Sequence, residues 1–337
     1  MKLIKKVRPK IKKSTIVIAG GAGFIGSHLV EAILKEKPKK LIVIDDLSLG
    51  KLKNLQPFLK QIVFIKKDLN KYKEIKKIFK TYKIDIVFNL VTIPLPYSFQ
   101  FPKKTFEVNT KSTLCLLELQ REGSFKTLCH FSSSEVYGTA KYEPMDENHP
   151  KNPTTTYAAG KAAADMLIET YVKMYGLDVF IVRPFNNFGP KQAFIGNSAA
   201  VIPITIWKIY NNKSPLIHGS GNQEREFIYV KDTVKIIISI FNKTKKGETV
   251  NILTGNNISI LKIVNLIIKI LNFKKKKIFT KPRVADVYCH NGCNKKLRKI
   301  IKIKKNNFNF QLKDTINYYF EYFKKNEKKS TNIRSQS

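Results

Sequence analysis

The stretch from Ser14 to Asp46, STIVIAGGAGFIGSHLVEAILKEKPKKLIVIDD, constrains the fold of this chain more than any other. It opens with a short apolar run, Ile16 to Ala19, of the length expected for a buried strand. Glycines follow at G-x-x-G-x-x-G spacing, and after them apolar residues recur at the period of a helix. A second apolar run ends in two aspartates. This order of strand, glycine turn, helix, strand and acid predicts a βαβ unit that binds a dinucleotide.

Each part of this unit has a physical task. Gly20, Gly23 and Gly26 allow a tight turn and let backbone N–H groups approach a pyrophosphate, which then lies at the positive end of the helix. Phe24 and Ile25, which begin that helix, are expected to line the same cofactor site. The context of strand and helix favours a cofactor turn over an unrelated glycine loop.

The acid at the end of the second strand bears on which dinucleotide binds. Asp45, nineteen residues after Gly26, can accept hydrogen bonds from an adenosine ribose. A carboxylate at this position would repel a 2′-phosphate, so NAD is favoured over NADP. The ammonium group of nearby Lys51 leaves NADP open as an alternative.

The chain continues to alternate strand-like apolar runs with segments of helical period as far as Arg183. Such alternation predicts the α/β class, with a doubly wound parallel Rossmann sheet over residues 14–183. Further strands are expected near residues 61–68, 85–90, 127–134 and 178–183, with helices near 71–80, 103–122 and 157–175.

The later half of the chain is less regular and contains many Gly, Pro and Asn residues. It predicts a smaller, mixed α/β substrate-binding domain over residues 184–325, with part of 225–255 returning to the Rossmann domain. Residues 1–13 are expected to form a disordered basic arm, and residues 326–337 a polar tail.

The net charge of +37 raises the question of a polyanionic partner. Nearly all of the basic residues are Lys, scattered along strands and helices without the interleaved aromatic residues that favour nucleic acid. Lysines on solvated faces explain the charge, so no nucleic-acid partner is expected. The chain also lacks a run of about 18 uncharged apolar residues, so no membrane span is expected.

The cysteines, Cys115, Cys129, Cys289 and Cys293, do not have the spacing of a disulfide framework, which favours a reducing cytoplasm. Cys289 and Cys293 invite a metal hypothesis, but no second pair of ligands stands nearby in the sequence. No metal site is therefore predicted.

Two later stretches supply candidate catalytic groups. The strand expected near residues 127–134 ends in a serine run that includes Ser133, and a later helix carries Tyr157 and Lys161 four residues apart on one face. A Lys ammonium and a positive nicotinamide would lower the pKa of the tyrosine, which is near 10 in a free side chain. Tyr157 could then remove the proton of a sugar hydroxyl while Ser133 holds the same oxygen.

Together these stretches resemble the extended short-chain dehydrogenase/reductase family, in particular its NAD-dependent nucleotide-sugar epimerases and dehydratases. The resemblance covers roughly residues 14–325 and rests on the motifs GGAGFIG, FSSSEVYG, YAAGK, RPFNNFGP and REFIYVKD. It implies a nucleotide-diphosphate sugar as substrate and an adenine contact from the Asp68-Leu69 pair. It also implies substrate contacts from Asn186, Arg225 and Arg283. His218 stands where the family often stacks an aromatic residue on the nucleotide base. The alternative is that His218 is an ordinary loop histidine.

Within this family the residues after the catalytic serine differ between reactions. Ser134 and Glu135 resemble the pair in GDP-mannose dehydratases, some UDP-N-acetylglucosamine 4,6-dehydratases and UDP-glucuronate decarboxylases. Glu135 as a base for C5 makes a 4,6-dehydratase the leading hypothesis, unless Glu135 is structural. Ser134 is a poorer acid than the aspartate of dTDP-glucose 4,6-dehydratases. UDP-sugar 4-epimerisation and UDP-glucuronate decarboxylation remain alternatives, and Gly160 resembles the decarboxylases.

A non-catalytic dinucleotide sensor or RNA-binding scaffold is a hypothesis of another class. A sensor has no need of Ser133, Tyr157 and Lys161, so the presence of all three favours an enzyme. The resemblance further implies a homodimer in which the helices near residues 103–122 and 157–175 form a four-helix bundle. The expected contacts are Leu114, Leu117, Met166 and Tyr171.

Overall fold

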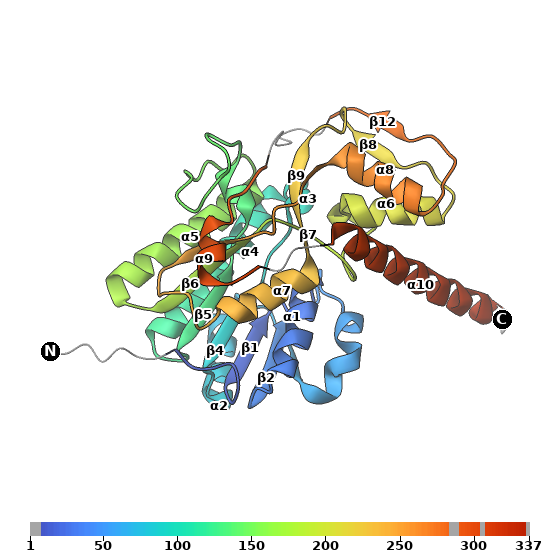
Figure 1. Cartoon of the computed structure of the whole chain (residues 1–337). Helices are drawn as coiled ribbons and strands as arrows, with labels where there is room; N and C mark the ends of the chain where they lie inside the picture. Colours follow the sequence, from blue (N-terminus) through green and yellow to red (C-terminus); the bar gives the residue numbers. More distant parts are fainter. Residues whose placement is uncertain (1–7, 283–289, 304–306, 335–337) are drawn as a thin grey trace.

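The larger part of the molecule is built on a parallel sheet of seven strands with the order β10-β6-β5-β4-β1-β2-β3 (Figure 1). A computed structural model of the chain describes residues 8–282, 290–303 and 307–334. In it the sheet consists of β1 (Thr15–Ala19), β2 (Lys40–Asp45), β3 (Val63–Lys66), β4 (Ile86–Asn89), β5 (Thr127–Phe131), β6 (Asp178–Pro184) and β10 (Thr249–Ile252). The predicted doubly wound parallel sheet is confirmed.

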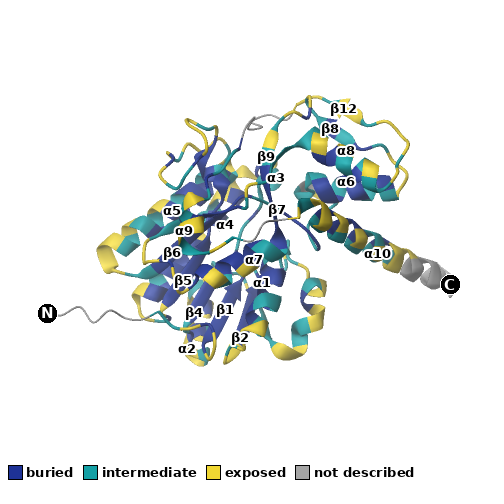
Figure 2. Cartoon of the chain, viewed as in Figure 1, coloured by how far each residue is buried: buried dark blue, intermediate teal, exposed yellow. Residues whose placement is uncertain are grey.

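Helices cover both faces of this sheet. On one face lie α1 (Phe24–Lys35) and α7 (Val230–Ile240), and on the other lie α2 (Tyr72–Tyr82), α4 (Pro102–Arg121) and α5 (Thr156–Tyr175) (Figure 1). The central strands are therefore buried on both sides, which explains why their sequences are continuous apolar runs (Figure 2).

The strand order reverses beside β1, whose two neighbours are β2 and β4. The connections from β1 and β4 run in opposite directions along the sheet, so a crevice opens at the carboxyl ends of these strands. The glycine turn follows β1 at this point. The fold thus brings the predicted cofactor turn to the place where open α/β sheets bind their ligands.

The smaller part of the molecule has its own apolar core and is mixed α/β, as predicted (Figure 1). It contains a three-stranded sheet of β7 (Asn186–Phe188), β9 (Glu224–Tyr229) and β11 (Asn257–Ser259), and a pair formed by β8 (Leu216–His218) and β12 (Ile278–Thr280). Its core is closed by α6 (Val201–Tyr210), α8 (Ile260–Ile270) and α10 (Phe308–Arg334). The short elements of the described chain are η1 (Leu52–Gln61), α3 (Leu95–Ser98), η2 (Ser134–Tyr137), η3 (Gly196–Ser198) and α9 (Lys295–Ile300).

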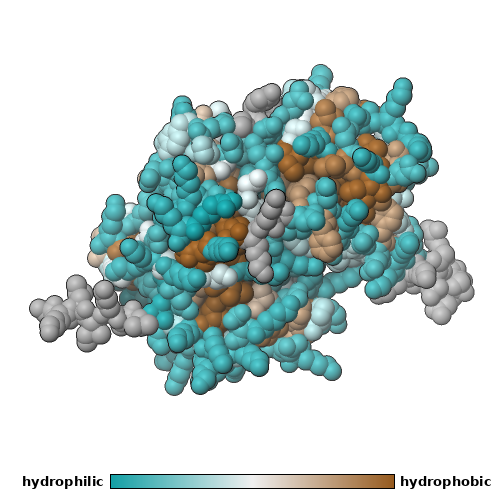
Figure 3. Space-filling view, viewed as in Figure 1, coloured by the Kyte–Doolittle hydropathy of each residue, from teal (hydrophilic) through white to brown (hydrophobic). Residues whose placement is uncertain are grey.

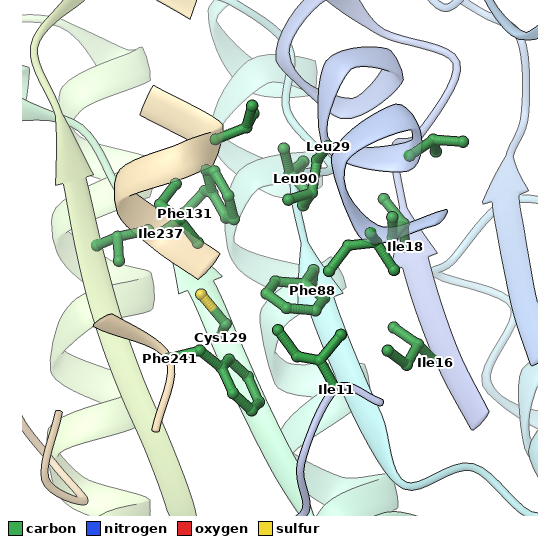
Figure 4. Packing of buried hydrophobic residues seen from close by; sticks show 14 of the residues in the cluster. Ile11, Ile16, Ile18, Leu29, Phe88, Leu90, Cys129, Phe131, Ile237 and Phe241 are labelled. Atoms are coloured by element: carbon green, nitrogen blue, oxygen red, sulfur yellow. The ribbon is translucent and has the colours of Figure 1, made fainter. Parts of the chain in front are cut away.

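The chain before β1 differs from the predicted disordered arm. The Arg8 guanidinium pairs with the Asp178 carboxylate at 2.7 Å and lies over the Phe180 ring, 4.6 Å from its centre. Ile11 is 5% exposed and packs beside Phe88 in the core (Figure 4). An arginine fork and an apolar side chain therefore hold residues 8–13 against the sheet, and the prediction is wrong for them. Residues 1–7 of the predicted arm lie outside the described residues.

The C-terminal boundary also differs from the prediction of a polar tail that begins at residue 326. Helix α10 continues through this position as far as Arg334. Residues 324–330, KKNEKKS, include several good helix formers, so their polarity does not end the helix.

Polar side chains dominate the face of the molecule shown in Figure 3. This agrees with lysines that lie on solvated surfaces rather than in the core. Within residues 8–282, 290–303 and 307–334, no helix has the length and apolar character that crossing a membrane requires.

Candidate active site

A cavity of about 670 Å³ lies in the crevice, and both parts of the molecule contribute to its wall. This volume is in the usual range for small-molecule and cofactor sites. The residues predicted from sequence that line it are Gly20, Gly23, Phe24, Ile25, Gly26, Asp45, Asp68, Leu69, Ser133, Ser134, Glu135, Tyr157, Lys161 and Asn186. The fold thus gathers the expected cofactor and catalytic residues in one place.

The glycine turn is shaped so that a pyrophosphate can approach the start of α1. A Cβ at Gly26 would lie 2.2 Å from the Gly20 carbonyl oxygen, so only glycine allows this contact between helix and turn. Gly20 itself has a φ of +77°, a region that favours glycine. The helix is preceded by Gly23 without a side chain that caps its first N–H groups, so these donors and the helix dipole face the cavity.

We expect Gly26→Ala to abolish retention of NAD and to lower the Tm. The added methyl group would push α1 away from β1, because it meets backbone atoms and not a flexible side chain. Overpacking of this kind costs about 1–3 kcal/mol of unfolding free energy. Thermal unfolding and the nucleotide content of the purified protein measure the two effects. Gly23→Ala is the matched control for stability, since its Cβ would lie 3.3 Å from the same oxygen. An unchanged Tm for Gly26→Ala would contradict the prediction.

Asp45 is held rigidly on the wall of the cavity. Its two carboxylate oxygens accept hydrogen bonds from the Ala22 and Leu47 N–H groups, both at 2.9 Å. Burial raises the pKa of Asp45, whereas these two bonds lower it. A carboxylate fixed in this way keeps lone pairs for ribose hydroxyls and repels a 2′-phosphate, which fits NAD.

Tyr157 and Lys161 lie on the first turns of α5, which Thr155 caps by accepting a hydrogen bond from the Ala158 N–H. Lys161 is 2% exposed, and its Nζ donates to the Phe131 carbonyl oxygen at 2.9 Å. This bond ties α5 to the end of β5, immediately before the serine run.

Burial is the largest influence on the ionisation of both side chains. It raises the pKa of Tyr157 to about 12, a rise that the Glu135 carboxylate reinforces and that hydrogen bonds from Ser133 and Thr92 oppose. It lowers the pKa of Lys161 to about 8. The prediction that Lys161 lowers the pKa of Tyr157 is therefore wrong for these side chains alone, because burial dominates and the Lys161 ammonium group donates to the Phe131 carbonyl oxygen.

Glu135 presents its carboxylate to the cavity from η2. Its backbone N–H donates to Ser133 Oγ at 3.2 Å, which leaves the hydrogen of Ser133 for the cavity. The Glu135 side chain is half-buried, and within the described residues its carboxylate has no hydrogen-bond partner. Its charge acts on Tyr157 and on His290. A carboxylate in this state can accept a proton from a bound molecule.

A buried ion pair behind the site was missed by sequence reasoning. Arg183 and Asp165 are both fully buried, with Arg183 Nη2 2.8 Å from Asp165 Oδ2. The same oxygen accepts a hydrogen bond from Ser132 Oγ at 2.9 Å. Since Asp165 lies one turn after Lys161, the pair joins α5 to β6 and to the end of β5. The rarity of arginine in a lysine-rich chain was the available signal.

Fewer of the residues that were predicted to bind the substrate line the cavity. Asn186 lines the cavity, whereas Arg225 and His218 are not among its lining residues. Arg225, on β9, donates to the Glu224 carbonyl oxygen at 2.8 Å, and His218 Nδ1, on β8, pairs with Thr280 Oγ1 at 2.8 Å. Arg283 lies outside the described residues, so its predicted contact has no structural account.

Cys293 is a buried free thiol, as are Cys115 and Cys129. Cys289 lies outside the described residues. No group of His, Cys, Asp and Glu within the described ranges is arranged to hold a metal ion.

The wall of the cavity also contains residues that sequence reasoning missed. Thr92 follows β4, and α10 contributes Tyr318, Tyr319 and Tyr322. A hydroxyl group placed directly after a predicted strand was the available signal for Thr92, because it lies at the same edge of the sheet as Ser133. The tyrosines gave no such signal, since a local pattern does not say which cleft a distant helix will reach.

Residues 16–252 match the model of the NAD dependent epimerase/dehydratase family. The chain belongs to this family. It is similar to the dTDP-D-glucose 4,6-dehydratase of Homo sapiens, with 33% identity over 265 residues, or 76% of this chain and 73% of the relative. It is also similar to two solved structures. One is a UDP-N-acetylglucosamine 4-epimerase from Methanobrevibacter ruminantium in complex with UDP-N-acetylmuramic acid, with 32% identity and a TM-score of 0.86 over 92% of this chain and 99% of that one. The other is a dTDP-glucose 4,6-dehydratase from Bacillus anthracis in complex with NAD, with 26% identity and a TM-score of 0.83 over 91% and 97%.

Membership of this family shows that the protein is an NAD-dependent enzyme of the epimerase/dehydratase type. The prediction of NAD as cofactor is confirmed. Because the family consists of enzymes, the alternative of a non-catalytic sensor or RNA-binding scaffold is wrong. The relatives divide between epimerases and dehydratases, so family membership alone does not select the reaction.

Proposed function

We propose that this enzyme is a nucleotide-sugar 4,6-dehydratase, which oxidises C4 of the sugar transiently and eliminates water across C5 and C6. The observation that carries the proposal is the Glu135 carboxylate, which lines the cavity near Tyr157 without a hydrogen-bond partner among the described residues. A 4-epimerase has no use for a base at C5. In such an enzyme the Glu135 carboxylate would take no part in the reaction.

Tyr157 is the base for the C4 hydroxyl. Its phenolate removes the hydroxyl proton while the Ser133 hydroxyl donates to the same oxygen and holds it. When bound, NAD supplies a hydride acceptor at C4, a positive charge that lowers the pKa of Tyr157, and a hydride for C6. Lys161 keeps its own positive charge one turn from Tyr157 at pH values below about 8, the pKa of its ammonium group.

Glu135 acts at C5. A ketone at C4 acidifies the C5 hydrogen, and the carboxylate removes it as a proton. The C6 hydroxide leaves as water with a proton from the newly formed Glu135 carboxylic acid. Ser134 lines the same part of the cavity but offers only a hydroxyl, which is a poor proton donor. After a hydride has reached C6, C5 takes a proton from solvent, and Tyr157 releases the proton of the C4 hydroxyl to solvent, which completes the 4-keto-6-deoxy product and restores both side chains.

A 4-epimerase is the second candidate, because the similar enzyme from Methanobrevibacter ruminantium has that activity. The resemblance of Gly160 to decarboxylases has a packing explanation. A Cβ at Gly160 would lie 3.1 Å from Asn109 Cβ and 3.2 Å from the Phe106 backbone, so the glycine lets α4 and α5 approach.

Mass analysis after incubation of the purified holoenzyme with UDP-, dTDP- and GDP-sugars separates the candidates. A dehydratase product has lost one water, a decarboxylase product has lost carbon dioxide, and an epimerase product keeps its mass. We expect loss of water from at least one substrate. Conversion of every accepted substrate without a change of mass would contradict the proposal.

For the substrate we propose that Asn186, Arg225 and Arg283 bind the diphosphate and that His218 stacks on the base. Asn186 supports this by its place in the cavity wall. Burial lowers the pKa of His290, and the charge of Arg225 lowers it further. His290 Nε2 lies 3.1 Å from the Ser134 carbonyl oxygen, so Arg225 acts on a residue that contacts the serine run.

A homodimer through α4 and α5 is also proposed. The two helices lie side by side, joined by a hydrogen bond from Tyr171 Oη to Glu118 at 2.7 Å (Figure 1). Leu114 and Met166 are exposed on them, Met166 by 60%, so both can contact a partner. Leu117, expected at this interface, is fully buried in the core, and that prediction is wrong. Tyr171 is half-buried by its own chain.

We expect light scattering at micromolar concentration to give twice the mass of one chain, and Met166→Glu to shift the protein toward the monomer. The substitution places a charge in an apolar contact, where it would be desolvated without a partner. Ile278→Glu is the matched control, because Ile278 is 50% exposed on β12, outside the two helices. A monomeric wild type, or equal effects of the two variants, would contradict the proposed interface.

A further inference from the structure

Thr92 places a second hydroxyl group near Tyr157, in addition to that of Ser133. Thr92 follows β4, is half-buried and lines the cavity with both residues. Its Oγ1 donates to Asn109 Oδ1 on α4 at 3.0 Å, and the Ile93 carbonyl oxygen is a more distant acceptor at 3.4 Å. Asn109 in turn packs against Gly160, one turn after Tyr157 on α5. Burial raises the pKa of Tyr157, and the Thr92 hydroxyl opposes that rise. Thr92 therefore stands between a fixed acceptor and the proposed base.

The side-chain oxygen of Asn109, which accepts the Thr92 hydrogen bond, is held in one orientation. Asn109 is fully buried, and its Oδ1 also accepts the Ile93 N–H at 2.9 Å. Its Nδ2 points at the Ile93 carbonyl oxygen, 3.4 Å away, so the amide cannot be turned round without losing both bonds. Gly160 allows this approach, because it leaves room for Asn109 between α4 and α5. Asn109 thus offers Thr92 the same acceptor throughout a reaction.

A threonine hydroxyl has a single hydrogen and two lone pairs. When its hydrogen points at Asn109, a lone pair can accept the hydrogen of a protonated Tyr157. Rotation about the Cβ–Oγ1 bond turns the hydrogen from Asn109 toward a Tyr157 phenolate. The proposed function takes Tyr157 through both of these states in each turnover. A methyl or an amide in the position of the hydroxyl would suit at most one of them.

We propose that Thr92 is a positioning residue for Tyr157, whose hydroxyl donates to the Tyr157 oxygen in the phenolate state and to Asn109 when Tyr157 is protonated. Thr92 gains and loses no proton in this exchange. The inference rests on the proposed role of Tyr157 as base. The charged groups that line this region are Glu135 on η2, Lys161 on α5 and Lys104 on α4, and a change at Thr92 leaves all three in place.

The test is the dependence of kcat on pH in the holoenzyme. Tyr157 works as a base in its ionised form, so kcat rises as the pH rises through its pKa. Thr92→Val keeps the shape and removes a donor to the phenolate, which raises that pKa and moves the acidic limb to higher pH by about one unit. At a pH below the limb, kcat falls about tenfold while KM changes little. Thr92→Ser returns the hydroxyl and is expected to restore the wild-type profile.

Thr315→Val is the matched control, since Thr315 is fully buried, donates to the Gln311 carbonyl oxygen at 2.8 Å and does not line the cavity. Its pH profile is expected to match that of the wild type. A Thr92→Val profile that overlays the wild type would overturn the proposal. So would a loss of rate without a shift of the limb, or a Thr92→Ser variant that fails to restore it. If Thr92→Val does not fold, Thr92→Ala is tested in its place. If neither variant folds while Thr92→Ser does, Thr92 has a purely structural role and the proposal is overturned. Full activity of Tyr157→Phe would instead refute the proposed base itself, whatever Thr92 does.

Discussion

Tyr157→Phe is expected to lower kcat by about 10²–10⁴-fold, the usual loss when a positioned base is removed, while the folded protein keeps its NAD. The substitution deletes only the phenolic oxygen that takes the proton of the C4 hydroxyl. The neighbouring ammonium group of Lys161 is held by the Phe131 carbonyl and not by Tyr157, so the rest of the site stays in place. Absorbance of the reduced nicotinamide in a single turnover measures the affected step, which is the oxidation at C4.

Tyr175→Phe provides the control for this loss. Tyr175 lies at the other end of the same helix, is 47% exposed and does not line the cavity. Its variant is expected to react at the wild-type rate. Equal losses in the two variants, or C4 oxidation at full rate by Tyr157→Phe, would show that Tyr157 is not the base.

Glu135→Gln is expected to separate oxidation from elimination. The amide keeps the shape of the side chain and removes its ability to take the C5 proton, so elimination should slow by about 10²–10⁴-fold. Oxidation at C4 depends on Tyr157 and should persist, so the reduced nicotinamide should still form and a 4-keto sugar should accumulate. Exchange of the C5 hydrogen with deuterium from the solvent should fall together with elimination. Mass analysis and NMR of the products measure both effects.

Glu147→Gln is the matched acid for comparison. Glu147 accepts the Asn251 N–H at 2.8 Å and is not part of the cavity wall. Its substitution tests the effect of losing a carboxylate that has a structural partner. Normal dehydration by Glu135→Gln would make Glu135 structural and remove the observation on which the proposed reaction rests.

The cofactor half of the site could be predicted because each of its features is local in sequence. A strand of apolar residues, three glycines at fixed spacing and an acid after the next strand determine where Gly26 and Asp45 lie, whatever the rest of the chain does. The helical period likewise places Tyr157 and Lys161 on one face of α5.

Features that depend on distant parts of the chain could not be predicted in this way. The Asp165–Arg183 pair joins a helix to a strand, and Thr92 meets Asn109 only because α4 packs over the end of β4. Helix α4 has apolar residues on more than one face, so its period did not show that Leu117 faces the core while Leu114 faces outward. The pKa of Tyr157 depends on burial, which the order of residues along a helix does not give.

The fate of a deuterium label at C4 of the sugar tests the proposed reaction most directly. The holoenzyme is incubated with a nucleotide sugar that carries deuterium at C4, and the product is analysed by mass and NMR. The proposed 4,6-dehydratase takes the label from C4 and places it on C6 of a product that has lost one water. A product of unchanged mass with the label back on C4 would identify a 4-epimerase and contradict the assignment of Glu135 as the base at C5.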